Sequence, residues 1–177
     1  MKNVLLYTFT IASILFKVNS ASAQISSLDE TTARLKADVY YLADDKLKGR
    51  LTGTKGAKIA AKYISNTYEN IGLKPLIGKK YTHEFSYTYI PNPHGTSETK
   101  KRKITGKNVV AFLDNGADKT ILIGAHYDHL GGNEHHNSTD PKSAGEIHNG
   151  ADDNASVVAI LLELARTSYK PEPKEKT

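Results

Sequence analysis

Two short segments of the chain bring together residue types that bind metal ions. Residues 119–130 contain the apolar run Ile-Leu-Ile followed by Gly-Ala-His-Tyr-Asp-His. Residues 149–157 read Asn-Gly-Ala-Asp-Asp-Asn-Ala-Ser-Val and lead into an apolar stretch. Histidine and carboxylates gathered at the carboxyl end of a buried strand are what a zinc site in an open α/β sheet needs. The sequence therefore predicts a zinc site built from these two segments.

Residues of the two segments differ in their expected roles. His126 and Asp128 are two positions apart, so at an extended strand end they point to the same side. A carboxylate beside a metal-binding imidazole fixes its tautomer and raises its basicity. We therefore expect His126 to be a ligand and Asp128 first a residue that orients it. Two adjacent carboxylates before a helix can also be N-caps, so we expect Asp152 to be a turn or capping residue.

Most other histidines lie in a polar loop. Their irregular spacing in a Gly-, Asn- and Ser-rich stretch favours solvent exposure, and the same loop carries two acidic residues expected at the surface. The one exception is His129, because it adjoins the candidate site. The remaining positions are His135, His136 and His148, with Glu134 and Asp140 as the acidic residues and His94 in an upstream Pro-rich turn.

The composition indicates a folded chain of ordinary domain size. Of 177 residues, 38% are hydrophobic and 24% charged, which is typical of a globular protein. The absence of Cys excludes disulfides and thiolate metal sites. The basic run at 100–103 has no interleaved aromatic residues, so despite the net charge of +5 we expect no nucleic-acid partner.

The first residues are typical of a secretory signal peptide. Lys2 provides a positive start, Val4–Phe16 is apolar, and Ala21-Ser22-Ala23 fits a cleavage site. The apolar stretch is too short to favour a membrane anchor. We therefore expect a signal peptide at 1–23 with cleavage after Ala23, a secreted or periplasmic protein at 24–177, and no membrane association after cleavage.

Hydrophobic periodicity predicts alternating helices and strands. Ser27 and Glu30 form a capping box, Thr54 can cap a second helix, and Gly72 can end it. Asp-Asn-Gly at 114–116 predicts a hairpin turn. The expected helices lie at about 28–43, 55–71 and 155–168, and the expected strands at 81–90, 109–113 and 120–125. The last strand lacks alternation, which favours burial on both faces.

The two candidate metal-binding segments together closely resemble the co-catalytic di-zinc aminopeptidases, metallopeptidase family 28. The upstream Gly-Arg-Leu-Thr-Gly at 49–53, the apolar stripe at 60–72 and Gly-Lys-Asn-Val at 106–109 are also similar to that family. The resemblance extends over essentially all of 24–177. It implies an α/β fold, a three-layer α/β/α sandwich on a mixed sheet of the zinc-exopeptidase kind.

The resemblance also implies residue roles. His126 would be a terminal ligand of one zinc, Asp128 would hydrogen-bond His126, and Asp153 would bridge two zinc ions. A cis peptide after the bridging residue, here Asp153–Asn154, is common in the family. Two zinc ions lower the pKa of a shared water toward ~7. With a nearby Glu as general base, the implied reaction removes the N-terminal residue from a peptide with a free N-terminus.

The sequence departs from the family pattern in two respects. Val157 stands where the family usually has Gly, and its branched side chain is expected to crowd the helix start. The general-base Glu and further ligands would follow Thr177, so this sequence reads as the N-terminal part of the fold, with the C-terminal half absent. Glu172 and Glu175 lack a strand pattern and are not candidates. We expect weak zinc binding, no hydrolysis by this chain alone, and poor solubility from uncovered apolar surface.

Two other functions remain open. One is a glutaminyl-cyclase-like transferase, which shares the fold and a similar His-Tyr-Asp segment but uses a single zinc and would leave His126 off the metal. The other is a non-catalytic remnant or binding module. Zinc stoichiometry of the whole protein, two or one, separates the first alternative from the aminopeptidase.

Overall fold

The computed structural model describes residues 28–89, 101–132, 138–139 and 145–169. The predicted signal peptide and the cap at Ser27 lie outside the described residues. So do several side chains considered above: His94, His135, His136, Glu134, Asp140, Glu172 and Glu175.

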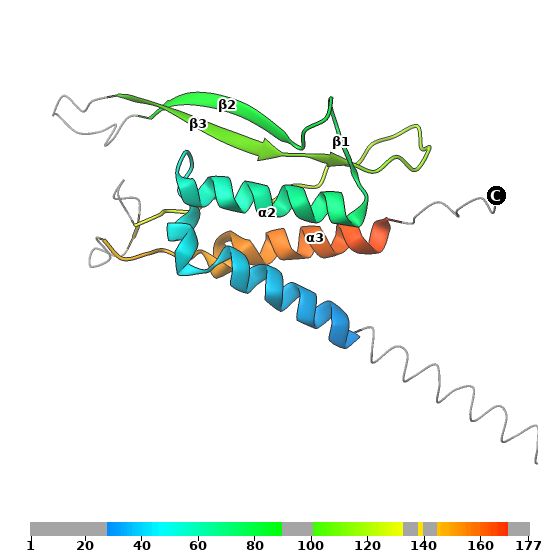
Figure 1. Cartoon of the computed structure of the whole chain (residues 1–177), viewed down its shortest axis with the longest axis horizontal. Coiled ribbons are helices and arrows are strands. Elements are labelled where there is room, and N and C mark those ends of the chain that lie inside the picture. Colours follow the sequence, from blue (N-terminus) through cyan, green and yellow to red (C-terminus); the bar gives the residue numbers. More distant parts are fainter. Residues whose placement is uncertain (1–27, 90–100, 133–137, 140–144, 170–177) are drawn as a thin grey trace, which may run out of the picture.

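The described chain combines helices with short antiparallel strands, which confirms a mixed α/β structure. We call residues 28–42 the N-terminal helix. In Figure 1 the β2–β3 ribbon covers one side of α2, α3 runs along α2, and the N-terminal helix lies beyond α3. The remaining elements are η1 (Asp45–Arg50), α2 (Lys55–Ile71), β1 (Lys74–Pro75), β2 (Thr82–Tyr89), β3 (Arg102–Val109), β4 (Ala111–Phe112), η2 (Ala151–Ala155) and α3 (Ser156–Ser168).

Helix α2 begins and ends where its capping residues predict. The Thr54 side chain accepts a hydrogen bond from the Ala57 amide at 3.4 Å. Gly72 has the left-handed conformation (φ 100°), and its amide donates to the Tyr68 and Glu69 carbonyls at 3.2 and 3.0 Å. Glycine takes this conformation without the strain that a Cβ would cause. The predicted helix at 55–71 is therefore confirmed at both ends.

The described strands form two separate pairs. β2 and β3 pair antiparallel from Thr82 opposite Val109 to Tyr89 opposite Arg102, which confirms the strand predicted at 81–90. β1 and β4 form the second, shorter pair. Strand β3 was not anticipated, because its sequence is polar and lacks the alternation of apolar residues that predicts a strand. The three-layer sandwich is not seen in the part of the chain that the structure describes.

The segment expected to be a buried third strand is exposed. Residues 113–130 carry no strand assignment, and Ile121 and Leu122 are 85% and 90% exposed. The predicted turn at 114–116 forms, since the Gly116 amide donates to the Asp114 carboxylate at 2.9 Å. It does not join a hairpin, because β4 pairs with β1 and not with residues 120–125. A strand needs hydrogen-bonded neighbours for its backbone. The predicted burial of 120–125 is therefore wrong for this structure, in which no described segment pairs with it.

The hydrophobic core lies between the N-terminal helix, α2 and α3. Buried side chains from all three helices meet there, and Tyr127 and Val109 pack on its edge. The predicted helix at 155–168 is confirmed as α3, which begins at Ser156. The core residues are Leu42, Leu47, Ala60, Ile64, Tyr68, Leu73, Ala155, Val158 and Leu162.

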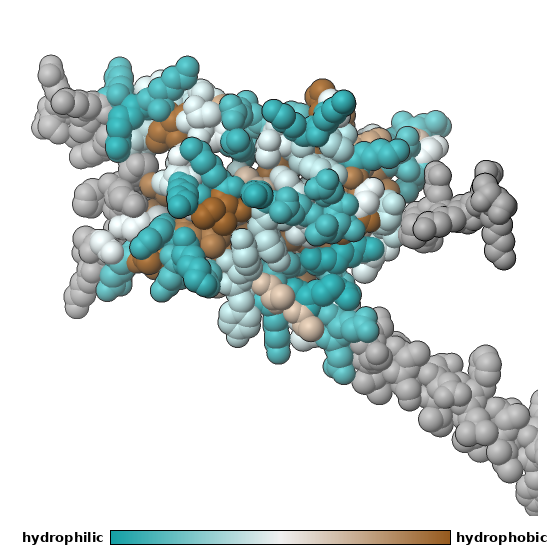
Figure 2. All heavy atoms as spheres, viewed as in Figure 1, coloured by the Kyte–Doolittle hydropathy of each residue, from teal (hydrophilic) through white to brown (hydrophobic). Residues whose placement is uncertain are grey.

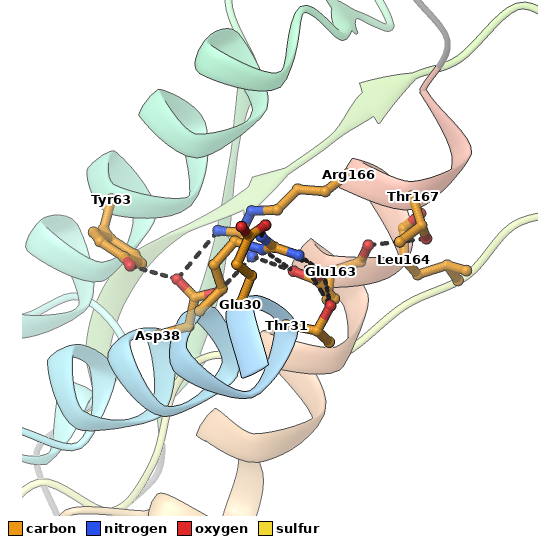
Figure 3. Close-up of polar contacts among 9 residues, drawn as sticks. Glu30, Thr31, Asp38, Tyr63, Glu163, Leu164, Arg166 and Thr167 are labelled. Carbon is orange, nitrogen blue, oxygen red and sulfur yellow. Dashed lines mark hydrogen bonds and ion pairs between the residues drawn. The ribbon is translucent and has the colours of Figure 1, made fainter. Parts of the chain in front are cut away.

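A network of charged side chains fixes the N-terminal helix to α3 (Figure 3). Glu163 accepts from Arg34 at 2.6 and 3.0 Å and from Arg166 at 3.1 Å. Arg166 also donates to Asp38 at 2.8 Å, and the Tyr63 hydroxyl donates to the same carboxylate. Asp38 is 2% exposed, so its charge is stabilised mainly by these donors. We call these five residues the helix-joining network.

The face shown in Figure 2 is largely hydrophilic, with separate hydrophobic patches. Within the described ranges, no helix combines the length and the apolar composition that crossing a bilayer requires.

Candidate metal site

The turn in η1 carries the backbone up to the candidate site. Lys48, Gly49 and Arg50 have positive φ angles of 50°, 64° and 49°. A Cβ at Gly49 would lie 2.5 Å from the carbonyl oxygens of Gly131 and His148, so only glycine allows this approach. The positive φ of Arg50 is uncommon for a residue with a side chain. This turn therefore contacts both segments that the sequence singled out.

Arg50 joins the two segments through their backbone carbonyls. Its guanidinium donates to Tyr127 O at 2.7 Å, Asn149 O at 2.6 Å and Gly150 O at 2.9 Å, and also to Leu42 O. The side chain is fully buried. Burial lowers the pKa of Arg50, while the negative charges of the two nearby site carboxylates oppose this shift. Arg50 thus holds 127 and 149–150 at a fixed separation.

His126 lies between two carboxylates. Its Nε2 is 3.0 Å from Asp153 Oδ1, and its Nδ1 is 3.5 Å from Asp128 Oδ1. Nδ1 also lies 3.1 Å from the Asp128 backbone oxygen. The structure therefore brings together the three residues that the sequence proposed for the site. The closer contact of Nδ1 is with the backbone oxygen of Asp128 and not with the carboxylate that was expected to orient the ring.

The proton positions favour a cation at this pair. A carbonyl oxygen only accepts hydrogen bonds, so the contact of Nδ1 with Asp128 O places a proton on Nδ1. In a neutral imidazole, Nε2 then presents a lone pair toward the Asp153 carboxylate. Such a pair is stable when Nε2 is also protonated or when both atoms are ligands of one cation. His126 Nε2 and Asp153 Oδ1 are therefore suitable donors for a metal ion.

His129 and His148 lie beside the same carboxylate. His129 Nδ1 is 3.6 Å from Asp153 Oδ2, and the His129 side chain is 13% exposed. Burial lowers the pKa of His129, and Asp153 partly opposes this shift. The His148 ring contacts that of His129 edge-on, and its Nε2 is buried. The expected proximity of His129 is confirmed, whereas the expected solvent exposure of His148 is wrong, because His148 forms a β-bridge with Gly131 and its ring packs on His129.

The turn before α3 decides between the two roles left open for Asp152 and contradicts the expectation for Val157. Asp152 is an exposed turn residue within η2, and its side chain makes no capping hydrogen bond there. Val157 is 41% exposed and lies in the first turn of α3, so it does not crowd the helix start. The peptide bond between Asp153 and Asn154 is cis, which confirms that prediction.

Two functional candidates had no role assigned from sequence. Arg50 and Thr52 both belong to Gly-Arg-Leu-Thr-Gly, a motif that was recognised only as similar to the family. The Thr52 hydroxyl donates to Asp128 Oδ2. The sequence signal for these two roles was a polar pair, an arginine and a threonine, set between two glycines upstream of a His-x-Asp motif.

The described residues fit part of a zinc site. Two ligand atoms on one tetrahedral zinc lie roughly 3.3 Å apart, which is close to the 3.0 Å between His126 Nε2 and Asp153 Oδ1. A catalytic zinc takes three protein ligands. Within the described ranges, no group of three or more His, Asp or Glu side chains is arranged to hold a metal ion. These residues thus supply two donors, and a complete site needs others.

Comparison with known proteins finds a family model that covers this site. The model of peptidase family M28 matches residues 108–176, which contain all four of His126, Asp128, His129 and Asp153. The chain is 29% identical over 117 residues to the alkaline phosphatase isozyme conversion protein of Escherichia coli (strain K12), covering 66% of this chain and 32% of that protein. It is 45% identical over 74 residues to the uncharacterized protein YfbL of the same organism, covering 40% of this chain and 21% of that protein.

The chain thus spans about a third or less of the length of these relatives. The match nevertheless coincides with the site, because both candidate metal-binding segments fall inside it. Residues 108–176 match the model of peptidase family M28, the family that the His-Tyr-Asp and Gly-Ala-Asp-Asp-Asn motifs predicted.

Proposed function

We propose that this chain forms part of a zinc-dependent aminopeptidase that removes N-terminal residues from peptides. At the family level the chain is a peptidase, and its substrates are accordingly peptides. The observation that supports the finer proposal is the 3.0 Å approach of His126 Nε2 to Asp153 Oδ1, two donors that lie far apart in the sequence.

The chain's own residues hold and orient the metal donors. Asp153 has both oxygens beside imidazoles, Oδ1 near His126 and Oδ2 near His129. A carboxylate with two available oxygens can bridge two cations, which is the role proposed for Asp153. Asp128 keeps the proton of His126 on Nδ1 and leaves Nε2 free to bind. Bound zinc would supply a water of lowered pKa as nucleophile.

The free N-terminus of the substrate is the second part of the proposal. Asp153 would help to hold a second zinc, which would supply a Lewis acid for the uncharged amine of the substrate, and this would restrict cleavage to the first residue of a peptide. The remaining ligands and the general base would come from residues beyond those described. We further propose that the protein acts in the periplasm or outside the cell, on the basis of residues 1–23.

The experiment measures metal-dependent cleavage by the natural protein that carries this chain. The substrates are an aminoacyl anilide with a free amine and the same anilide with an acetylated amine. We expect cleavage of the free-amine substrate alone, loss of activity after chelation, and recovery with added Zn²⁺ to a stoichiometry of two per chain.

Other results would redirect the proposal. A single zinc together with cyclisation of an N-terminal glutamine would assign the glutaminyl-cyclase reaction instead. A zinc-loaded protein that transforms neither substrate would assign a non-catalytic role. Cleavage by the isolated 24–177 polypeptide with zinc would instead show that no further ligands are required.

A further inference from the structure

We propose that Thr52 is a positioning residue that orients the Asp128 carboxylate and, through it, His126. The inference rests on the proposed function, because it assigns to Thr52 an effect on the metal-binding imidazole. The contact that carries it is the hydrogen bond from the Thr52 hydroxyl to Asp128 Oδ2.

The two oxygens of Asp128 have different partners. Oδ1 lies 3.5 Å from His126 Nδ1, and Oδ2 accepts from Thr52. An ionised carboxylate only accepts hydrogen bonds, so the threonine hydroxyl must be the donor. With Oδ2 held, rotation of the carboxylate group about its bond to Cβ is restricted, and Oδ1 remains beside the imidazole.

Thr52 itself is held by a closed turn. The Thr54 amide donates to Leu51 O at 3.0 Å, and the Thr54 hydroxyl donates to the same carbonyl at 2.6 Å. Thr54 then begins α2 as its N-cap. The hydroxyl of Thr52 is therefore presented from the rigid start of a helix and not from a freely moving loop.

Arg50 holds the segment that contains Asp128 close to the turn that contains Thr52. Its guanidinium binds the carbonyl of Tyr127, the residue before Asp128, at 2.7 Å. In addition, the His129 amide donates to Arg50 O at 3.3 Å and the Gly131 amide to Gly49 O at 3.0 Å. Residues 49–52 and 127–131 thus run side by side, with Asp128 inside the region that these contacts immobilise.

Mutation of a group that orients a metal ligand typically lowers metal affinity about 10–100-fold. Asp128 is the group beside His126, and the hydroxyl of Thr52 holds its carboxylate, so we expect an effect at the lower end of that range. Removal of this hydroxyl should therefore weaken metal binding without removing a ligand, and it should leave packing nearly unchanged if the replacement has the same shape.

The experiment compares Thr52→Val with Thr52→Ser in the natural protein. The valine has the shape of threonine without the hydroxyl, and the serine keeps the hydroxyl. We expect Thr52→Val to lower Zn²⁺ affinity about 10-fold, measured by competition with a chromophoric chelator, and Thr52→Ser to stay close to wild type. Thr88→Val on the exposed face of β2 is the matched control and should leave affinity unchanged.

A double-mutant cycle shows whether Thr52 acts through Asp128. In an Asp128→Asn background, Thr52→Val should cause no further loss of affinity. His126 Nδ1 contacts the backbone oxygen of Asp128, which Thr52 does not touch, so nitrogen chemical shifts of His126 in the metal-free protein should report the same tautomer in wild type and Thr52→Val. Equal affinity in wild type and Thr52→Val, a loss that Thr52→Ser shares, or an additive loss in the double variant would overturn the inference. A wild type that binds zinc but cleaves no peptide would overturn only the proposed function.

Discussion

Two clusters of charged side chains in this molecule differ in charge balance. The helix-joining network sets two carboxylates, Asp38 and Glu163, against the guanidinium groups of Arg34 and Arg166. Both carboxylates are nearly buried. The candidate metal site also has two carboxylates, Asp128 and Asp153, but its contacts come from imidazoles, a hydroxyl and backbone groups.

The difference separates a structural cluster from one suited to a cation. Permanent guanidinium charges neutralise the network, so it has no need of a further ion. In the site, Arg50 uses its guanidinium on backbone carbonyls, and Asp153 is 68% exposed at its side chain. The site therefore retains negative charge and open donor atoms at one place, which is the condition for binding Zn²⁺.

The strongest test of this comparison removes the central carboxylate of the site. Asp153→Asn should lower the metal-dependent hydrolysis rate at least about 10³-fold, because it removes several kcal/mol of transition-state stabilisation. Thermal stability should stay within a few degrees, since Asp153 is exposed. The neighbouring Asp152→Asn is the control and should retain activity. Equal losses in the two variants would remove the distinction drawn between these adjacent residues.

The next test replaces Arg50, the arginine that joins the two segments of the site. Arg50→Lys keeps the charge but loses the planar group that binds several carbonyls at once. We expect about 3 kcal/mol of lost stability, since hydrogen bonds to charged groups contribute about 1.5–3 kcal/mol each. The melting temperature should fall by about 6–12 °C. Arg102→Lys, exposed on β3, should have little effect; a similar fall there would show that the loss is not specific to the site.

A smaller effect is expected when the helix-joining network is weakened. Glu163→Gln should cost about 2 kcal/mol, because the carboxylate loses its charge-assisted bonds to Arg34 and Arg166. Denaturant titration at pH 7 measures this difference. Glu84→Gln is the matched control, because Glu84 pairs with Lys107 at the surface and should change stability by less than about 0.5 kcal/mol.

The same network makes a prediction about pH. The hydrogen bond from Arg34 lowers the pKa of Glu163 below its ordinary value of 4.5. A lowered folded-state pKa adds stability that is fully present above the unfolded value and is lost as pH falls through the folded value. The stability difference between wild type and Glu163→Gln should therefore hold from neutral pH to about 5 and shrink below about 4.5. A difference that stays constant to pH 3 would contradict the assigned ion pair.

Local signals in the sequence predicted local structure well. Thr54 and Gly72 fixed the ends of α2, and the motif around His126 and Asp153 indicated the donors that the fold brings together. The contributions of Arg50 and Thr52 were missed, because each depends on contacts with residues about 75 or more positions away. Hydrophobic periodicity carries no information about such partners.

The prediction that residues 120–125 form a buried strand was wrong for a related reason. Their apolar run predicts burial, but burial depends on which neighbouring strand provides hydrogen bonds. The polar sequence of β3 was likewise not read as a strand, although pairing with β2 over eight residues makes it one. In both cases the partner, and not the segment itself, decides the outcome.

The smallest expected effect tests this exposed segment directly. Leu122→Lys in the 24–177 chain should change the free energy of unfolding by less than about 0.5 kcal/mol, because the side chain is 90% exposed. Solubility should rise, since a charge interrupts the apolar run that we expect to promote aggregation. Leu162→Lys, at a fully buried core position, should instead prevent folding. A loss of several kcal/mol in Leu122→Lys would show that 120–125 is a buried strand in solution, as its sequence alone predicts.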